Sequence, residues 1–405
     1  MVSEKEITGI RLQKNHCLSQ DTDYAAYSYE STANVRKLHE TIPGYKPTKL
    51  VSLKSFAQRA GIKAMLVKDE STRFGEQAFK PLGGVYAMFR VICEQLHLDY
   101  RLTSLNQLLN TQQYREAIGK MTFITTTDGN HGRGVSWASG LFGSHSYVYM
   151  PKGTVPVRAE NIRRAGNAQV EITDMLYDDC VKFTDKLARR NGWFLIQDTS
   201  WPGNELIPSW IMLGYTTMVY EALLQMRAQG YDRPTHVFLQ AGVGSMAGAV
   251  TAALKATYGD NMPIVATVEP TEVACFYESL KAGDGNPHTS TGNNITIMAG
   301  LNCATPCGLA WNLFRDYGRY ALSVPDEVTR RGMRLLAHPL GNDPKVVSGE
   351  SGAVTTGLVE ELCLSSSCKD LREELMLDKD AVVLCFSTEG DTDPENYRNI
   401  TGYHL

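Results

Sequence analysis

The segment Phe74-Gly-Glu-Gln-Ala-Phe-Lys-Pro-Leu-Gly-Gly84 places one lysine, Lys80, between an apolar residue and a turn-forming run. The mostly apolar residues 85–93 follow and predict a helix that begins just after the lysine. Desolvation and the helix dipole lower the pKa of an amine held there, and a neutral amine attacks carbonyl groups. The alternative is an ordinary solvated lysine in a loop. The motifs in the rest of the chain distinguish this alternative from a reactive lysine.

Strands and helices alternate on both sides of this segment. Such alternation predicts an α/β fold with mostly parallel sheets that are covered by helices on both faces. A chain of 405 residues exceeds the usual size of a single core, so two domains are expected. The predicted strands are 63–68, 122–126, 146–150, 169–172, 193–197, 236–240, 263–268 and 381–386.

The expected large domain is discontinuous and consists of residues 1–95 and 215–405. Residues 96–214 are expected to form a small domain, so that each domain is an open, mostly parallel sheet flanked by helices. Residues 1 to about 50 are polar and weakly periodic, which predicts an arm that packs across the body of the protein.

Composition argues against several classes of protein. The hydrophobic content of 43%, charged content of 21% and net charge of −4 are ordinary for a globular protein and favour neither nucleic acid nor membrane as a partner. The first residues, Met-Val-Ser-Glu-Lys-Glu-Ile, lack an apolar signal core, and no stretch is long and apolar enough to span a bilayer. Nine cysteines without a CxxC pair predict no metal site and a cytoplasmic protein with reduced thiols.

The loop Gly242-Val-Gly-Ser-Met-Ala-Gly248 lies between a predicted strand and a predicted helix. Its backbone N–H groups can converge on a phosphate at the start of the helix. Its glycine spacing, with Glu269 at the end of the next strand, also fits a dinucleotide site, so a nicotinamide-dependent dehydrogenase is one alternative. A tight turn that needs small residues is another.

A second loop, Asp128-Gly-Asn-His-Gly-Arg-Gly134, also connects a strand to a helix. It can hold a second anion, and Asn130 offers both a donor and an acceptor. We expect His131 to be a core or capping histidine rather than a catalytic one.

The order of these loops resembles that of the tryptophan-synthase-like family, the pyridoxal-phosphate enzymes of fold type II. The resemblance covers the chain from about residue 60 to its end and implies a cofactor cleft between the two domains. The matching segments are Ala78-Phe-Lys-Pro-Leu-Gly-Gly84, Thr125-Thr-Thr-Asp-Gly-Asn-His-Gly-Arg-Gly134, Gln197-Asp-Thr-Ser-Trp201, Gln240-Ala-Gly-Val-Gly-Ser-Met-Ala-Gly248, Gly349-Glu-Ser-Gly352 and Ser387-Thr-Glu-Gly-Asp-Thr-Asp393.

The resemblance implies pyridoxal 5'-phosphate as cofactor, bound covalently by Lys80. It implies that Asn130 contacts the ring hydroxyl and that Ser387, followed by Thr388, faces the ring nitrogen. Glu389 and Asp391 lie close in sequence, so a carboxylate at the ring nitrogen stays open. The remaining cofactor-binding residues implied are Phe79, Gly242, Val243, Gly244, Ser245, Met246 and Glu350.

Asp128 narrows the implied activity. Related serine and threonine dehydratases usually carry a small residue there, whereas family members that cleave 2,3-diaminopropionate carry an acid. The resemblance therefore implies α,β-elimination of D- and L-2,3-diaminopropionate to pyruvate and two ammonia molecules. Lys80 would be the base on one face and Asp128 on the other, and Asp198 is a second candidate acid. A helix N-cap at Asp128 and a surface role for Asp198 are the alternatives.

Serine or threonine dehydration on the same fold remains the nearest alternative activity, and a non-catalytic binding protein is the most distant one. The resemblance also implies a homodimer. It places Cys275 and Cys303 near the mouth of the cleft, where we hypothesise that they pair under oxidising conditions, with two independent thiols as the alternative.

Overall fold

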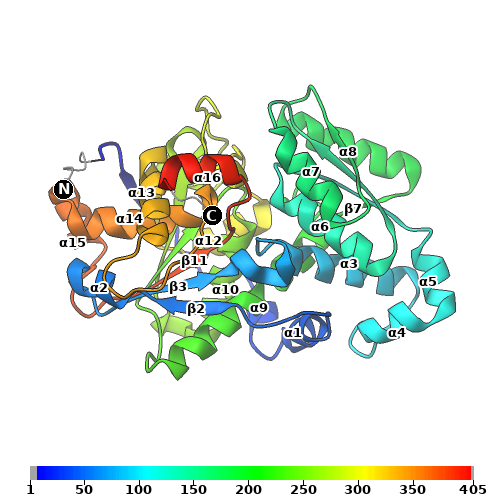
Figure 1. Ribbon diagram of the computed structural model, residues 1–405, viewed down its shortest axis with the longest axis horizontal. Coiled ribbons are helices and arrows are strands. Elements are labelled where there is room, and N and C mark those ends of the chain that lie inside the picture. The colour runs from blue at the N-terminus through cyan, green and yellow to red at the C-terminus, as the bar shows by residue number, and fades with distance from the viewer. Residues whose placement is uncertain (1–6, 403–405) are drawn as a thin grey trace.

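The strands of the protein form two separate sheets, which a computed structural model describes over residues 7–402 (Figure 1). The seven-stranded sheet has the order β1-β10-β9-β8-β11-β3-β2, and the four-stranded sheet has the order β6-β5-β4-β7. The strands are β1 (Arg11–Lys14), β2 (Lys49–Ser52), β3 (Ala64–Asp69), β4 (Thr122–Thr126), β5 (His145–Met150), β6 (Gln169–Ile172), β7 (Phe194–Leu195), β8 (His236–Gln240), β9 (Ile264–Pro270), β10 (Tyr320–Val324) and β11 (Val382–Ser387).

All pairs in the smaller sheet are parallel, and only the two edge strands of the larger sheet, β1 and β2, run antiparallel to their neighbours. Parallel strands need helical crossovers, which cover both faces of such a sheet. The predicted α/β class with two mostly parallel sheets is therefore confirmed. Strands β4 to β7 lie within residues 96–214, but the domain boundaries themselves stay a prediction.

Figure 1 shows α6, α7 and α8 around the smaller sheet, and α3 running between the two halves of the molecule. Within residues 7–402, no helix has the length and apolar character needed to cross a bilayer. The helices are α1 (Ala33–Glu40), α2 (Lys54–Ala60), α3 (Pro81–Gln95), α4 (Leu105–Asn110), α5 (Gln112–Ile118), α6 (Asn130–Phe142), α7 (Pro156–Ala165), α8 (Tyr177–Asn191), α9 (Leu206–Ala228), α10 (Ser245–Tyr258), α11 (Cys275–Ala282), α12 (Gly308–Tyr317), α13 (Asp326–Ala337), α14 (Glu350–Leu364), α15 (Lys369–Glu374) and α16 (Pro394–Thr401).

The described part of the N-terminal arm packs on the larger half of the molecule. Strand β1 extends the large sheet beside β10, and α1 contacts α9. The side-chain amide of Asn15 donates to the carbonyl oxygens of Arg315 and Gly318 at 2.8 and 2.7 Å. The expected absence of a signal core concerns the first six residues, which lie outside the described ones.

Helix α3, which follows Lys80, is held between α9 and α6 by glycines. A Cβ at Gly83 would lie 2.6 Å from the ring of Tyr215, and a Cβ at Gly134 would lie 3.0 Å from the backbone nitrogen of Pro81. Real Cβ atoms essentially never come as close as at Gly83, so that crossing requires glycine, and at Gly134 a Cβ would force the backbone of Pro81 to shift. The close crossings fix the start of α3, and with it Lys80, at the junction of the two sheets.

A buried charge network supports the segment between β3 and the lysine loop. Lys68 pairs with Glu221 at 2.6 Å, while Arg73 pairs with Glu70 at 2.9 Å and with Glu221 at 2.7 Å. Two cations and two anions balance one another inside the protein. Removing one partner would leave a buried charge uncompensated, which typically costs about 3–5 kcal/mol.

Candidate active site

One cavity between the two sheets collects most of the predicted site residues. The empty space in it, together with the open solvent at its mouth, amounts to about 700 Å³. Polypeptide segments far apart in the chain meet here because the carboxyl ends of β4, β8 and β11 point toward this junction. The predicted residues in its wall are Phe79, Lys80, Asp128, Asn130, Asp198, Gly242, Val243, Gly244, Ser245, Met246 and Thr388.

Two predicted cofactor residues, Ser387 and Glu350, lie outside this wall. The hydroxyl of Ser387 donates to the Ser348 hydroxyl at 2.7 Å, while the next residue, Thr388, lines the cavity. Successive side chains of a strand point to opposite faces, which explains why one of the pair turns away. Glu350 lines a neighbouring cavity and accepts a hydrogen bond from Asn396.

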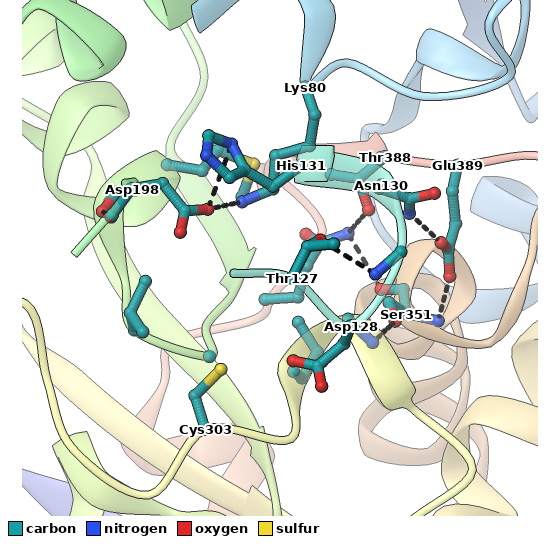
Figure 2. A pocket seen from close by; sticks show the side chains of 18 of the residues that line it. Lys80, Thr127, Asp128, Asn130, His131, Asp198, Cys303, Ser351, Thr388 and Glu389 are labelled. Atoms are coloured by element: carbon teal, nitrogen blue, oxygen red, sulfur yellow. Dashed lines mark hydrogen bonds and ion pairs between the residues drawn. The ribbon is translucent and has the colours of Figure 1, made fainter. Parts of the chain in front are cut away.

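The amine of Lys80 forms an ion pair with the carboxylate of Asp198 (Figure 2). Burial alone would lower the pKa of Lys80, but the charge of Asp198, the neighbouring Tyr215 and the hydrogen bond to Asp198 together outweigh burial and raise that pKa. Burial would raise the pKa of Asp198, but His131 and Lys80 lower it to about 2. Without cofactor, therefore, the lysine is an ammonium ion, and a buried Asp198 replaces the surface alternative.

Asp128 is not the N-cap of α6. The hydroxyl of Thr127 accepts hydrogen bonds from the backbone N–H groups of Gly129 and Gly132, both at 2.9 Å, and so takes the capping role. The side chain of Asp128 lies in the cavity wall, where burial raises its pKa to about 7. A carboxyl with that pKa can accept or release a proton near neutrality.

The glycine loop between β8 and α10 suits a phosphate group. Gly244 has a φ of +87°, and α10 begins at the next residue, so the loop residues precede the positive end of the helix dipole. A Cβ at Gly244 would lie 2.1 Å from the ring of Phe276, so only glycine fits there. The loop thus matches an anion cradle, and the residues present fit the phosphate of the implied cofactor.

Glu269 does not serve this loop as a ribose ligand. Its carboxylate is fully buried and accepts hydrogen bonds from the backbone N–H groups of Phe276 and Tyr277, at 2.7 and 2.8 Å. Burial raises the pKa of Glu269 to about 8. The acid that suggested a dinucleotide site instead satisfies the first turn of α11.

The side chain of Asn130 is bonded to the carboxylate of Glu389, a residue that the sequence left open as a group at the ring nitrogen. Its side-chain amide donates to Glu389, whose other oxygen accepts from the backbone N–H of Ser351 at 2.9 Å. Glu389 is 1% exposed and ties the Asn130 loop to the start of α14. Cys303, which the resemblance placed near the mouth of the cleft, lines the cavity. No site role was predicted from the sequence for the further cavity residues Thr127, Gly129, His131, Tyr177, Gln240, Gly300, Leu301 and Ser351.

All nine cysteines lie in the described part of the chain, where no disulfide is formed. Cys275 and Cys303 are both buried and make no disulfide with each other. The structure therefore shows two independent thiols, the alternative to the hypothesised pair. Among residues 7–402, no group of three or more His, Cys, Asp and Glu side chains is arranged to hold a metal ion.

A phosphate cradle facing a buried lysine across a cleft between two parallel sheets is the arrangement of pyridoxal-phosphate enzymes of fold type II. A dehydrogenase would need Glu269 as a ribose ligand, but Glu269 is bonded to the first turn of α11. The fold and the site therefore define a pyridoxal-phosphate enzyme of fold type II. The sequence model of the family described as "Pyridoxal-phosphate dependent enzyme" matches residues 41–384, so the chain belongs to that family and pyridoxal phosphate is its cofactor.

Within this family, the chain is similar to enzymes named for one activity. Diaminopropionate ammonia-lyase of Escherichia coli strain K12 is 46% identical over 375 residues, which are 92% of each chain. The crystal structure of the holo diaminopropionate ammonia lyase from Escherichia coli superimposes with a TM-score of 0.91 at 43% identity, covering 98% of this chain and 97% of that one. A complex of the Escherichia coli enzyme with D-serine gives the same TM-score and identity and covers 98% of both chains.

Gly244→Ala is expected to weaken cofactor binding by about 10–10²-fold, because the added methyl group collides with Phe276 and displaces the cradle; such overpacking costs about 1–3 kcal/mol. Equilibrium dialysis of the cofactor measures the change. Gly143→Ala is the matched control, since Gly143 also has a positive φ, +73°, but a Cβ there meets nothing within 4 Å. Equal cofactor affinity in the two variants would contradict the assignment of the cradle.

Proposed function

We propose that this chain catalyses the α,β-elimination of 2,3-diaminopropionate to pyruvate and two ammonia molecules, as a carbon–nitrogen lyase. The observation that carries the proposal is the likeness to diaminopropionate ammonia-lyase over 92% of both chains. Serine dehydration is the second candidate, because the relative from Escherichia coli also forms a complex with D-serine.

When bound, pyridoxal phosphate supplies an electron sink that acidifies the α-carbon of an amino acid. Lys80 would hold it covalently, residues 242–246 would bind its phosphate, and Asn130 would contact its ring hydroxyl. Since the hydroxyl of Ser387 is turned to Ser348, Thr388 becomes the proposed hydroxyl at the ring nitrogen.

Two bases line the cavity from different elements. Lys80 stands at the start of α3, and Asp128 lies in the loop between β4 and α6. Figure 2 shows the amine of Lys80 directed toward Asp198, well apart from the carboxylate of Asp128. The two enantiomers of an amino acid present their α-protons on opposite faces of a planar group. An enzyme with one base for each face can therefore use both isomers, which we propose for this one.

The leaving nitrogen must depart with its protons, because amide ion is a very poor leaving group. Asp198 lies in the cavity wall beside Lys80 and can hold the substrate's β-amino group once Lys80 is engaged elsewhere. A β-amino group that receives one proton as its bond to carbon breaks leaves as neutral ammonia. We therefore assign Asp198 to the departing group and Lys80 and Asp128 to the α-proton.

The test is a pyruvate assay on the purified protein with the four candidate substrates, D- and L-2,3-diaminopropionate and D- and L-serine. Pyruvate should form from diaminopropionate with a higher kcat/KM than from serine, and two ammonia molecules should accompany each pyruvate. A higher kcat/KM for either serine isomer would move the assignment to serine dehydration.

A pH profile provides a separate prediction. Below a pKa of about 7, Asp128 carries a proton and cannot accept another, so kcat/KM for the D-isomer should fall about tenfold per pH unit there and level off above it. The two enantiomers have the same pKa values in solution, so ionisation of the substrate cancels in the D/L ratio of kcat/KM. A pH dependence of that ratio therefore reports ionisation of the enzyme, here of Asp128. A D/L ratio that stays constant between about pH 5.5 and 8.5 would contradict a base role for Asp128 alone.

We further propose that the enzyme is a cytoplasmic homodimer. The family resemblance supports the dimer, and the composition of the chain supports the location. Light scattering on the purified protein would test the dimer, and a tagged full-length chain would test the location by cell fractionation.

A further inference from the structure

Three buried histidines make the same hydrogen bond but differ at their second nitrogen. In His39, His131 and His236, Nε2 lies 2.9, 2.7 and 2.7 Å from a backbone carbonyl oxygen. A carbonyl oxygen only accepts, so Nε2 carries the proton in all three. The Nδ1 atoms of His39 and His236 each bond a threonine hydroxyl at 2.7 Å, whereas Nδ1 of His131 has no hydrogen bond.

His131 therefore does not behave like a capping or core histidine. Both nitrogens of such a residue are normally satisfied, as in His39 and His236, because an unpaired buried polar atom is costly. The free Nδ1 of His131 instead lies 3.7 Å from Oδ2 of Asp198, the same oxygen that pairs with Lys80. Figure 2 shows the amine of Lys80, the carboxylate of Asp198 and the ring of His131 meeting at that oxygen.

The charge of this group depends on Lys80. While Lys80 is an ammonium ion, it balances Asp198, and burial lowers the pKa of His131 and keeps its ring neutral. Once the lysine nitrogen is bonded elsewhere, the carboxylate loses that partner and faces the lone pair of Nδ1. Two electron-rich atoms repel unless a proton lies between them. The charged groups acting on His131 are Asp198 and Lys80, and its own segment carries Asp128 and Arg133.

We propose that His131 and Asp198 together hold one proton whenever Lys80 is not an ammonium ion, and that this pair delivers it to the leaving β-nitrogen. The inference rests on the proposed elimination for its second half only. The first half concerns the protonation of this chain's own side chains and is tested without substrate.

The proposed step balances. A base of the enzyme takes the α-proton, and the electron pair left on the α-carbon forms the double bond to the β-carbon. The bond between the β-carbon and nitrogen breaks with its electron pair on nitrogen. That nitrogen takes the proton from the His131–Asp198 pair and leaves as ammonia. The pair ends as a neutral imidazole beside a carboxylate, and it is reloaded with one proton before the next turnover.

Nitrogen-15 NMR of the histidine-labelled holoenzyme tests the proton store directly. In the holoenzyme the lysine nitrogen is bonded to the cofactor, so His131 should carry a proton on both ring nitrogens at neutral pH. Asp198→Asn removes the carboxylate and should return His131 to the neutral form. The spectrum of His131→Gln assigns the signal. A neutral ring with a bare Nδ1 in the wild-type holoenzyme would overturn the proposal.

Kinetics test the delivery of the proton. Glutamine at position 131 retains an N–H group for the Ile196 carbonyl but has no ionisable nitrogen. His131→Gln should lower kcat on 2,3-diaminopropionate by about 10²-fold, the lower end for lost acid–base catalysis, with KM changed less than about threefold. The matched control is His236→Gln, which changes a histidine with the same carbonyl bond outside the cavity and should leave kcat unchanged.

The outcomes separate the two proposals. An unchanged kcat in His131→Gln, or an equal loss in His236→Gln, overturns the delivery role of His131. A wild-type enzyme that forms no pyruvate from 2,3-diaminopropionate contradicts the proposed function instead. In that case the NMR measurement still decides whether His131 and Asp198 share a proton.

Discussion

Lys80→Ala is expected to abolish multiple turnover and the near-visible absorbance of lysine-bound cofactor, while the fold remains intact. In the proposed mechanism Lys80 supplies both the covalent link to the cofactor and one of the two bases, so no other residue should replace it. Its side chain lies at the start of α3 and forms an ion pair with Asp198 in the cavity wall, so its loss should leave the glycine crossings of α3 in place. Absorbance spectra, the pyruvate assay and circular dichroism measure the three parts of the result.

The control for this experiment is Lys255→Ala. Lys255 is also a buried lysine paired with an acid, Asp260 at 3.0 Å, but it lies at the other end of α10, outside the cavity. That variant should retain absorbance and turnover. In the native protein, borohydride reduction should fix the cofactor to the peptide that contains Lys80. A reduced cofactor found on another lysine would end the assignment.

The predicted strands correspond to eight of the eleven strands in the described residues, whereas β1, β2 and β10 were not predicted. Strands β4, β6 and β8 have the predicted bounds, because short runs rich in apolar and β-branched residues end there at turn-forming residues. Helices α6 and α10 begin at Asn130 and Ser245, earlier than the apolar pattern indicates. Asn130 and His131 in the first turn of α6, and Ser245 in the first turn of α10, line the cavity. These polar residues interrupt the apolar period that marks a helix in the sequence.

Site residues were predictable from the sequence where the local motif indicates their chemistry. They were not predictable where contacts with distant parts of the chain determine what a side chain does. Lys80, Asp128 and the glycine loop were found because each stands at a turn between a strand and a helix. The orientations of Ser387 and Thr388 depend on one step of strand alternation, which the sequence does not reveal. From the sequence, His131 is expected to be a core or capping residue. Only the structure shows that Nδ1 of His131 faces Oδ2 of Asp198.

Asp128→Asn is expected to lower activity on the D-isomer by about 10²–10⁴-fold, the usual effect of losing a general base, and to lower activity on the L-isomer much less. The substitution keeps the shape of the side chain and removes its ability to accept a proton. Thr127, not Asp128, caps α6, so the loop should keep its conformation. The pyruvate assay on each pure isomer measures both effects, and circular dichroism checks the fold.

The matched control is Asp179→Asn, which makes the same charge change at a carboxylate that is 62% exposed in the first turn of α8. If that variant matched Asp128→Asn, the effect would be one of net charge near the cleft and not of a base. Equal losses on both isomers would make Asp128 the acid for the leaving ammonia in each reaction. Full activity on both isomers would sink the two-base assignment, and Lys80 would then have to reach both faces of the substrate by moving during the reaction.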